Sequence, residues 1–438
     1  MKKQILLFLV LCAAINSAQA LPKAAFAIRG YSNQALTYIN LQTGVVRDSV
    51  VAIGPAANAL VIRGNKLYVV NSGGSFVGLN ASIMIFNIAD IINNVQPLPV
   101  TRVSIPDNKN PYDLLFVNDT KAYISYLLDS SVVAFNPSNN TLGRRIQVGL
   151  GPEGLAVANG KVYVANAYNP ANFAYGTTVS VVSTTTDSVL RTLNVYFNPQ
   201  SFGVDALGRL HVVSTGPYDN TGRVTVFNTT TDAPVGTVQL FGNVSSVVFN
   251  SAQTAYSSAS GLVAYNANTL DTIRTNRNPY PIASGSLTID RGDTLYIART
   301  GSITLYNALT RDSLSRFSLT AAAPYFGVAV YREQPTGVAE GETPAEFLLA
   351  QNYPNPFNPT TEIRYQISEV GGQRSEVSHV TLRVFDVLGR EVATLVNEQM
   401  QPGSYSIQFD GRSLSSGMYF YRLTNGGKST TKKLTLMK

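Results

Sequence analysis

A unit of four short strands that repeats along residues 24–331 constrains the fold more than any other feature of this sequence. The repeat is clearest at 151–195, where a Gly-Pro pair, an Asn159-Gly160 turn and a strand at 161–166 precede two further strands. The second strand of each copy carries a ring-bearing anchor. The seven anchors are Phe26, Tyr68, Tyr123, Tyr163, His211, Tyr256 and Tyr296.

A second series of anchors marks the end of the third strand in every copy. These residues are Asn40, Asn87, Asn136, Ser183, Asn228, Asn266 and Asn307. Subtracting neighbouring positions gives spacings of 47, 49, 47, 45, 38 and 41 residues. A period of roughly 40 to 50 residues with four strands per repeat is typical of β-propeller blades. The sequence therefore predicts an all-β fold whose first domain, residues 21–331, is a seven-bladed β-propeller.

The two ends of the array predict how the ring closes. The first copy begins at its second strand, at 24–29, without an inner strand before it. Residues 324–331 have the pattern of an inner strand with no blade after it. We expect this last strand to complete the first blade, because closure removes the unpaired sheet edges that could otherwise pair with another chain.

Residues 1–20 have the features of a secretory signal peptide, with two lysines at the start, an apolar run and small residues before a cleavage point after Ala20. We therefore expect Sec-dependent export to the periplasm. Cys12, the only cysteine, lies in this segment, so the exported chain would have no disulfide, cysteine metal site or thiol nucleophile. A lipoprotein anchored through Cys12 is the alternative, but Leu11 stands where a lipobox needs a small residue.

The charge and hydropathy of the chain argue against nucleic-acid binding and against a membrane span. The formal net charge is +7 over 438 residues and no basic run occurs, so nucleic acid is not an expected partner. After the signal peptide, no segment has the ~18 consecutive apolar residues that a transmembrane helix needs. We expect no membrane-spanning segment in the exported chain.

One face of the predicted propeller collects the candidate binding residues. The loops that lead into the inner strands share this face with the loops that join second to third strands. Two of the latter, at 71–82 and 167–177, are longer than a blade requires, which is typical of a binding surface. The candidate ligand-binding residues are Asn58, Asp113, Glu153, Gln200, Arg299, Phe76, Tyr168, Phe173 and Tyr175.

These residues suit two kinds of ligand. Aromatic rings among amides suit sugars or extended polymers such as cell-surface polysaccharide, unless the rings fold inward and only hold their own loops. Asp113 and Glu153, near the channel, could bind a divalent cation or act as an acid/base pair, with Arg299 as a neutralising partner. The alternative is that each carboxylate caps its own turn by accepting backbone N–H groups.

The sequence contains no catalytic constellation. His211 stands where other copies have tyrosine, and His379 lies in a polar loop outside the propeller, so neither has an obvious metal or nucleophile partner. We therefore expect a binding module rather than an enzyme, with no cofactor apart from the divalent cation considered above.

The propeller pattern stops after Tyr331, and two further segments follow. Residues 332–346 are rich in Pro, Gly and Glu without periodicity, which is typical of a linker. Residues 347–438 return to short strands separated by Gly-containing turns, which predicts a small immunoglobulin-like β-sandwich.

Three motifs and the chain end carry a family resemblance in residues 347–438. The motif residues are Asn352, Tyr353, Pro354, Asn355, Pro356, Phe357, Asn358, Pro359, Gly389, Arg390, Gly417, Tyr419, Lys432, Lys433 and Lys438. Together they resemble the type A C-terminal sorting domain of the type IX secretion system, although the polar insert at 368–379 is longer than is usual there. The resemblance implies Sec export followed by passage through the type IX machinery, so that the protein is secreted or held on the outer cell surface.

The propeller more loosely resembles YVTN-repeat β-propellers, through strands such as 163–166, Tyr-Val-Ala-Asn. That family includes binding modules, surface-layer proteins and lactonase-like enzymes, so the resemblance implies a fold and leaves the function open. We expect a binding or scaffolding module. The alternatives are a metal-assisted hydrolase or lactonase that uses Asp113 and Glu153, and a structural surface-layer component.

Overall fold

The computed structural model describes most of the chain. The described residues are 22–30, 34–74, 79–169, 171–217, 220–320, 323–332, 348–349, 351–352, 355–367, 378–400, 403–425 and 428–437. The expected signal peptide and most of the expected linker lie outside these ranges, as do Phe76, Tyr353, Pro354 and Lys438. The chain divides into two compact units, residues 1–338 and 339–438.

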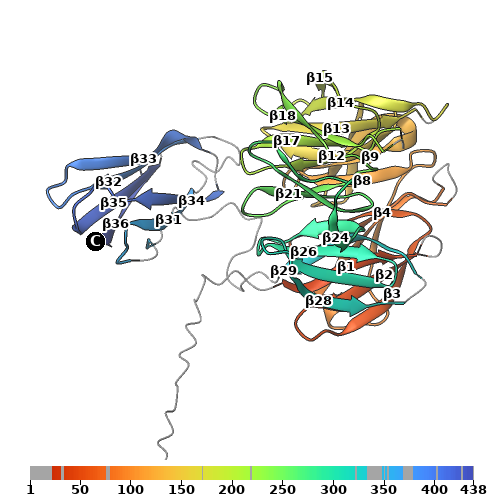
Figure 1. Cartoon of the computed structure of the whole chain (residues 1–438), viewed down its shortest axis with the longest axis horizontal. Coiled ribbons are helices and arrows are strands. Elements are labelled where there is room, and N and C mark those ends of the chain that lie inside the picture. Colours follow the sequence, from red (N-terminus) through yellow and green to blue (C-terminus); the bar gives the residue numbers. More distant parts are fainter. Residues whose placement is uncertain are drawn as a thin grey trace, which may run out of the picture. The chain divides into compact units, whose positions relative to one another are not determined.

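The described residues of the first unit form seven antiparallel sheets, and Figure 1 labels many of their strands. The first sheet contains β29 (Tyr325–Arg332), β1 (Pro22–Arg29), β2 (Gln34–Asn40) and β3 (Val46–Gly54), and the second contains β4 (Ala57–Arg63), β5 (Lys66–Asn71), β6 (Ser82–Asn87) and β7 (Thr101–Ser104). The third contains β8 (Pro111–Phe116), β9 (Ala122–Tyr126), β10 (Ser131–Asn136) and β11 (Thr141–Gln147), and the fourth contains β12 (Pro152–Ala158), β13 (Lys161–Tyr168), β14 (Tyr175–Ser183) and β15 (Val189–Asn194).

The remaining three sheets follow the same plan. The fifth contains β16 (Pro199–Val204), β17 (Arg209–Ser214), β18 (Arg223–Asn228) and β19 (Pro234–Gln239). The sixth contains β20 (Val247–Phe249), β21 (Thr254–Ser258), β22 (Gly261–Asn266) and β23 (Thr272–Arg274), with β24 (Tyr280–Ala283) as an additional strand on β22. The seventh contains β25 (Ser286–Ile289), β26 (Thr294–Arg299), β27 (Ser302–Asn307) and β28 (Ser313–Ser318).

The sheets form a closed cycle. Strand β29 pairs antiparallel with β1, with Val330 opposite Ala25, so the two ends of the repeat array lie in one sheet. The inner strands contact one another in the order β4, β8, β12, β16, β20, β25 and β29, and β29 in turn contacts β4. The repeat therefore builds a β-propeller, as the sequence predicts.

The ring-bearing anchors lie on the second strand of each sheet and are all buried. Three of them also donate their hydroxyl groups to the neighbouring sheet. The bonds run from Tyr123 to the Asp187 carboxylate, from Tyr163 to the Asp232 carboxylate and from Tyr256 to the Ala308 carbonyl. A ring is needed at this position because it fills the space between two sheets and reaches a partner across it.

The recurring asparagine at the end of the third strand has a local cause. At Asn40, Asn228, Asn266 and Asn307 the side-chain oxygen accepts hydrogen bonds from the backbone N–H groups two and three residues later. Ser183 does the same with its hydroxyl group. Such turns satisfy backbone donors that have left the sheet, and they fix the hairpin to the fourth strand.

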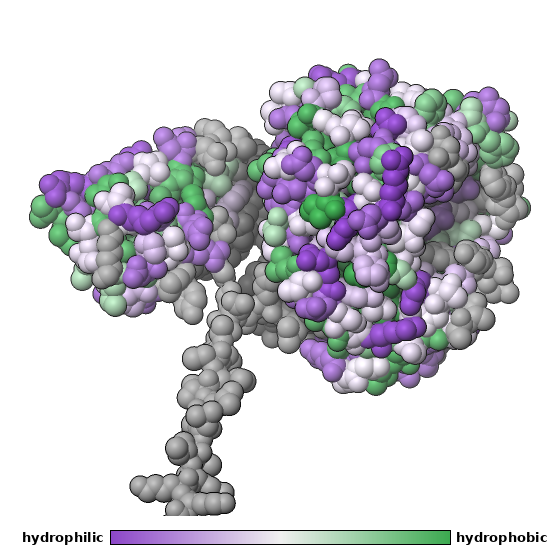
Figure 2. Space-filling view, in the orientation of Figure 1, coloured by the Kyte–Doolittle hydropathy of each residue, from purple (hydrophilic) through white to green (hydrophobic). Residues whose placement is uncertain are grey.

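Helices are short in the described part of the chain. The α-helix α1 (Ile88–Ile92) follows β6 and is capped by the side chain of Asn87, and a 3-10 turn, η1 (Leu127–Asp129), follows β9. None of the described helices is long and apolar enough to cross a membrane. On the face drawn in Figure 2, apolar side chains occur in small groups among hydrophilic ones.

The second unit contains two sheets. One consists of β30 (Leu348–Leu349), β31 (Thr360–Ile367) and β34 (Gly403–Asp410), and the other of β33 (Glu391–Met400), β32 (Ser378–Phe385), β35 (Gly417–Asn425) and β36 (Lys428–Leu436). Ile363 from the first sheet shares a buried core with Leu382 and Tyr421 from the second, so the two sheets form a β-sandwich. Strand β32 begins inside the expected polar insert, which places His379 on a strand.

Candidate functional site

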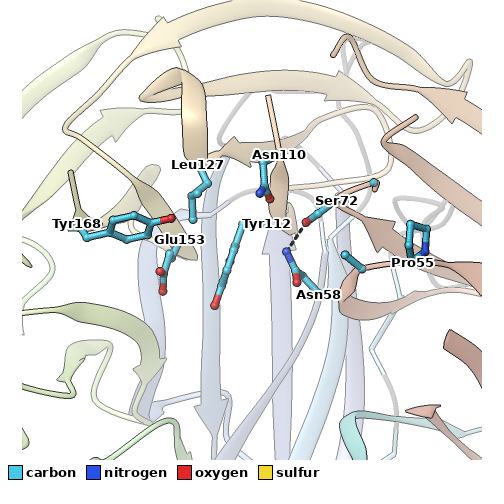
Figure 3. Close-up of a pocket in the computed structure, with 10 residues that line it drawn as sticks. Pro55, Asn58, Ser72, Asn110, Tyr112, Leu127, Glu153 and Tyr168 are labelled. Atoms are coloured by element: carbon cyan, nitrogen blue, oxygen red, sulfur yellow. Dashed lines mark hydrogen bonds between the residues drawn. The ribbon is translucent and has the colours of Figure 1, made fainter. Parts of the chain in front are cut away.

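A cavity of about 340 Å³ lies where three neighbouring propeller sheets begin their inner strands (Figure 3). Its lining residues are Pro55 and Ala56 before β4, Asn58 on β4, Ser72 and Gly73 after β5, Asn110 before β8, Tyr112 on β8, Leu127 in η1, Glu153 on β12 and Tyr168 at the end of β13. The cavity brings together three of the expected site residues, Asn58, Glu153 and Tyr168.

Glu153 is the ionisable acid of this cavity and the only glutamate between residues 21 and 332. Its side chain hydrogen-bonds Tyr112, whereas its Oε2 atom is buried without a hydrogen-bond partner among the described residues. Burial raises the pKa of Glu153 to about 8, and the bond from Tyr112 lowers it only in part. The raised pKa favours the protonated form of this carboxyl group near neutral pH.

Asn58 and Ser72 form a fixed polar wall of the cavity. The Asn58 amide donates to Ser72 Oγ, as the dashed line in Figure 3 shows. Ser72 Oγ donates in turn to the Pro111 carbonyl at 2.7 Å. Because Pro111 belongs to the next sheet, this chain of bonds both joins two sheets and orients the amide.

Asp113 has a different role from Glu153. One carboxylate oxygen accepts the Leu114 N–H at 2.8 Å, and the other accepts the Leu155 N–H at 2.9 Å. Burial raises the pKa of Asp113, and these two backbone bonds oppose the rise. One oxygen thus bonds within β8 and the other connects β8 with β12, so both accept backbone N–H groups, and Asp113 is not among the lining residues of the cavity.

Two other expected site residues lie apart from this cavity. Gln200 Oε1 accepts a hydrogen bond from the Thr215 hydroxyl at 2.8 Å, on the fifth sheet. Arg299 Nε lies 3.4 Å from Ser302 Oγ, at the end of β26. Among the ion pairs of the described residues, none joins Arg299 to Asp113 or Glu153.

An aromatic pair lies where β13 meets the loop to β14, with Tyr168 at the end of the strand and Phe173 in the loop. The rings of Tyr168 and Phe173 are stacked, with centroids 6.3 Å apart and planes 10° from parallel. Phe173 is 63% exposed, and Tyr175 pairs with Tyr168 across the two strands. One ring of the pair lines the cavity and the other faces solvent, so the stack extends the site outward. Phe76, on the other long loop, lies outside the described residues.

The sequence interpretation missed Tyr112, which hydrogen-bonds the Glu153 side chain. A signal for it exists in the repeat. Aligning Pro111 with Pro152 places Tyr112 and Glu153 at the same position, directly after the proline that begins each inner strand. In the described ranges, no three His, Cys, Asp or Glu side chains gather as a metal-binding cluster.

The first sorting motif fixes the start of the tail to its final strands. Asn352 is buried, and its backbone N–H donates to the Tyr421 hydroxyl at 2.8 Å. Asn355 Oδ1 accepts the Thr435 N–H at 2.9 Å. Phe357 is also buried, and its own N–H donates to the Thr435 carbonyl. These residues therefore hold the sandwich together.

The other motif residues occupy turns and the last strands. Gly389 has a φ of +78° in the β32–β33 turn, where Asp386 caps the backbone and pairs with Arg390 at 2.7 Å. The Tyr419 hydroxyl donates to the Ser415 carbonyl at 2.8 Å. Of the remainder, Pro356, Asn358 and Pro359 precede β31, Gly417 begins β35, and Lys432 and Lys433 lie on β36.

The tail matches a known family. Residues 351–437 match the family described as a secretion system C-terminal sorting domain, in agreement with the resemblance seen in the sequence. This tail directs export through the type IX secretion system to the cell surface or the extracellular space. No curated protein matches the chain as a relative.

Solved structures resemble the propeller. The quinonprotein alcohol dehydrogenase-like protein of Bacteroides thetaiotaomicron is 12% identical, with a TM-score of 0.50 over 70% of this chain and 78% of that one. Hydrazine synthase of Kuenenia stuttgartiensis is 12% identical, with a TM-score of 0.49 over 64% of this chain and 96% of that one. Apo AztD of Citrobacter koseri is 12% identical, with a TM-score of 0.46 over 71% of this chain and 98% of that one. At such identity the first likeness shows the fold alone.

Proposed function

We propose that this chain is an exported β-propeller that binds an extracellular ligand in the cavity lined by Asn58, Glu153 and Tyr168. The buried, unpaired Oε2 atom of Glu153 carries the proposal. A buried polar atom without a partner is costly, and a ligand that supplies the partner recovers that free energy. The stacked ring of Phe173 would extend the contact beyond the cavity, which suits a sugar or one end of a polymer such as cell-surface polysaccharide.

The proposed domain arrangement delivers this site to the outside of the cell. Residues 1–20 would be the Sec signal peptide, 21–331 the binding module, 332–346 a linker and 347–438 the sorting domain. The sorting tail supports this route. A ligand found outside the cell is therefore the relevant class.

A metal-assisted hydrolase is less well supported. It would need Asp113 together with Glu153 as ligands or as an acid/base pair. Both oxygens of Asp113 already accept backbone N–H groups, which supports a capping role instead. The structural surface-layer alternative predicts ordered self-assembly without a small ligand.

The test is a binding screen of the chain from residue 21 onward against a glycan array and a library of small extracellular metabolites, with and without calcium. Ala56→Phe would fill the cavity, because Ala56 lines it. Ala206→Phe, at an exposed position in the β16–β17 turn, is the matched control. Saturable binding that Ala56→Phe abolishes and Ala206→Phe preserves would support the proposal. Binding that survives Ala56→Phe would place the ligand elsewhere, and ordered self-assembly without any ligand would favour the surface-layer alternative.

A further inference from the structure

The charge of the cavity restricts the class of ligand it can hold. Glu153 is its one acid, and none of the described lining residues is Lys, Arg or His. An anionic ligand would meet no cationic side chain here, and its charge would further disfavour ionisation of Glu153. A cationic ligand would supply the counter-charge that the ionised form of Glu153 needs.

The position of Glu153 is set by its backbone and by one side-chain bond. Ser125 Oγ donates to the Glu153 carbonyl at 2.6 Å, which holds the start of β12 against the preceding sheet. Tyr112 hydrogen-bonds the carboxyl group, and Oε2 remains buried without a partner among the described atoms. For the ionised carboxylate, which only accepts hydrogen bonds, the missing partner is a donor inside the cavity, such as an N–H group of a ligand.

Two tyrosines lie close to this carboxyl group. Tyr112 hydrogen-bonds the carboxyl group directly. Burial raises the pKa of Tyr168, and the negative charge of ionised Glu153 raises it further. Figure 3 shows Tyr168 and Tyr112 beside Glu153, with Leu127 next to them. Aromatic rings around a carboxylate favour an ammonium group, because both attract a cation while the apolar surfaces cover its carbon frame.

We propose that the cavity binds an organic cation, a primary or secondary ammonium group whose N–H donates to Glu153 Oε2 and whose carbon frame packs against Tyr112, Tyr168 and Leu127. This inference rests on the proposed function and names its ligand class. A divalent metal ion fits less well, because a single carboxylate and the amides of Asn58 and Asn110 supply few of the oxygen ligands that it needs. Binding of the cation would ionise Glu153 with release of its proton to solvent, whereas without the cation the raised pKa favours the protonated group.

The probes are three ammonium compounds, methylammonium, benzylammonium and 1,4-diaminobutane, with benzyl alcohol as the neutral isostere of the second. Affinities would be measured by calorimetry on the chain from residue 21 onward. We expect at least one ammonium probe to bind saturably, and benzylammonium to bind at least tenfold more tightly than benzyl alcohol. Glu153→Gln should lose at least tenfold in affinity, whereas Asp119→Asn, which removes an exposed charge paired with Arg63, should not.

A second measurement reads the ionisation of Glu153 directly. With ¹³C-labelled glutamate, the resonance lost in Glu153→Gln identifies this carboxyl group among the others, all of which lie after residue 332. We expect this resonance to move to the ionised position when the ammonium probe binds. Equal affinity for benzyl alcohol, full affinity of Glu153→Gln, or no binding of any ammonium probe would overturn the inference. A neutral ligand that Ala56→Phe excludes would still leave the proposed function standing, whereas a cavity that binds nothing would overturn both.

Discussion

The Oγ atom of Ser125 donates a 2.6 Å hydrogen bond to the carbonyl oxygen of Glu153 and so joins the third propeller sheet to the fourth. The same kind of bond recurs around the ring. Ser72 Oγ donates to the Pro111 carbonyl at 2.7 Å and Thr215 Oγ1 donates to the Val244 carbonyl at 2.9 Å, whereas Ser258 Oγ accepts the Gly285 N–H at 3.0 Å. A hydroxyl group at the end of a second strand thus satisfies the backbone where the next sheet begins, and this places the cavity residues.

Replacing Ser125 by alanine tests this connection. Ser125 is fully buried, and it also accepts the Asp113 N–H, so the variant would leave backbone groups of both strands unpaired. We expect a loss of about 1–3 kcal/mol in the free energy of unfolding, measured by urea denaturation. Ser315→Ala, at an exposed position on β28, should stay within about 0.5 kcal/mol of the wild type. Equal stabilities of the two variants would contradict a structural role for the bond.

Glu153→Gln should make the protein more stable at alkaline pH. The pKa of Glu153 is raised from 4.5 to about 8, so the folded chain keeps a proton that the unfolded chain releases between these values. The free energy of unfolding of the wild type therefore falls as the pH rises through this window, and glutamine lacks the titration. We expect similar stabilities near pH 4 and an advantage of about 2–4 kcal/mol for the variant above pH 8. Urea denaturation at several pH values measures this difference in the free energy of unfolding. A difference that does not change with pH would refute the raised pKa of Glu153.

The fold is predictable from the sequence because each repeat carries residues with a local requirement. A buried ring is needed between sheets at positions such as Tyr163, and an oxygen is needed to cap the hairpin at positions such as Asn228. These requirements recur with the period of the blade, so they mark it. Strands β24 and β30 lack any such marker. They are only four and two residues long, which is too short for a periodic pattern in the sequence.

The site is less predictable because strand irregularities decide which side chains enter the cavity. Side chains alternate along a regular strand, but the register shifts between Pro111 and Leu114 on β8 and between Pro152 and Leu155 on β12. A sequence contains no clear signal for such a bulge. The two carboxyl groups that were expected to act together therefore have different surroundings. Glu153 lines the cavity beside Tyr112, whereas Asp113 accepts hydrogen bonds from the backbone.

His211 should make the stability fall on mild acidification. Its Nε2 lies 3.0 Å from Asp205 Oδ2 and its Nδ1 lies 2.8 Å from the Tyr265 hydroxyl, with the side chain fully buried. Burial lowers the pKa of His211 below 6.5, despite the opposing effect of Asp205. As the pH falls, the unfolded chain therefore binds a proton at His211 before the folded chain does. The contribution of neutral His211 to the free energy of unfolding is present above pH 6.5 and is lost as the pH falls toward the pKa of the folded state.

The measurement compares wild type with His211→Gln by urea denaturation between pH 7 and pH 5. We expect the variant to be less stable at pH 7, because it loses two buried hydrogen bonds. The difference in the free energy of unfolding between the two proteins should narrow as the pH falls. Taking the difference between the two proteins cancels the titration of other groups such as Glu153. A constant gap would show that His211 does not titrate differently in the folded and unfolded chains.

Phe357→Ala should destabilise the sorting domain and reduce export. The Phe357 side chain is 2% exposed, and its ring centroid lies 5.9 Å from that of Phe409. Truncating a buried phenylalanine costs about 3–5 kcal/mol, which is a large part of the stability of a small sandwich. The amount of protein outside the cell should fall accordingly. Val387→Ala, at a position 65% exposed, is the control and should be exported normally. Normal export of the Phe357 variant would mean that the machinery does not need this packing.

Phe173→Ala should weaken binding without affecting the fold. Phe173 stacks on Tyr168, which lines the cavity, but is itself 63% exposed, so little buried surface is lost in the free protein. The variant should unfold within about 0.5 kcal/mol of the wild type. Removing the outer ring should cost the bound ligand about 0.5–1.5 kcal/mol, a loss of roughly two- to tenfold in affinity. Leu207→Ala, 66% exposed in the β16–β17 turn, is the matched control, and its affinity should be unchanged. If both variants bind as tightly as the wild type, the stacked pair only holds its own loop and the site ends at Tyr168.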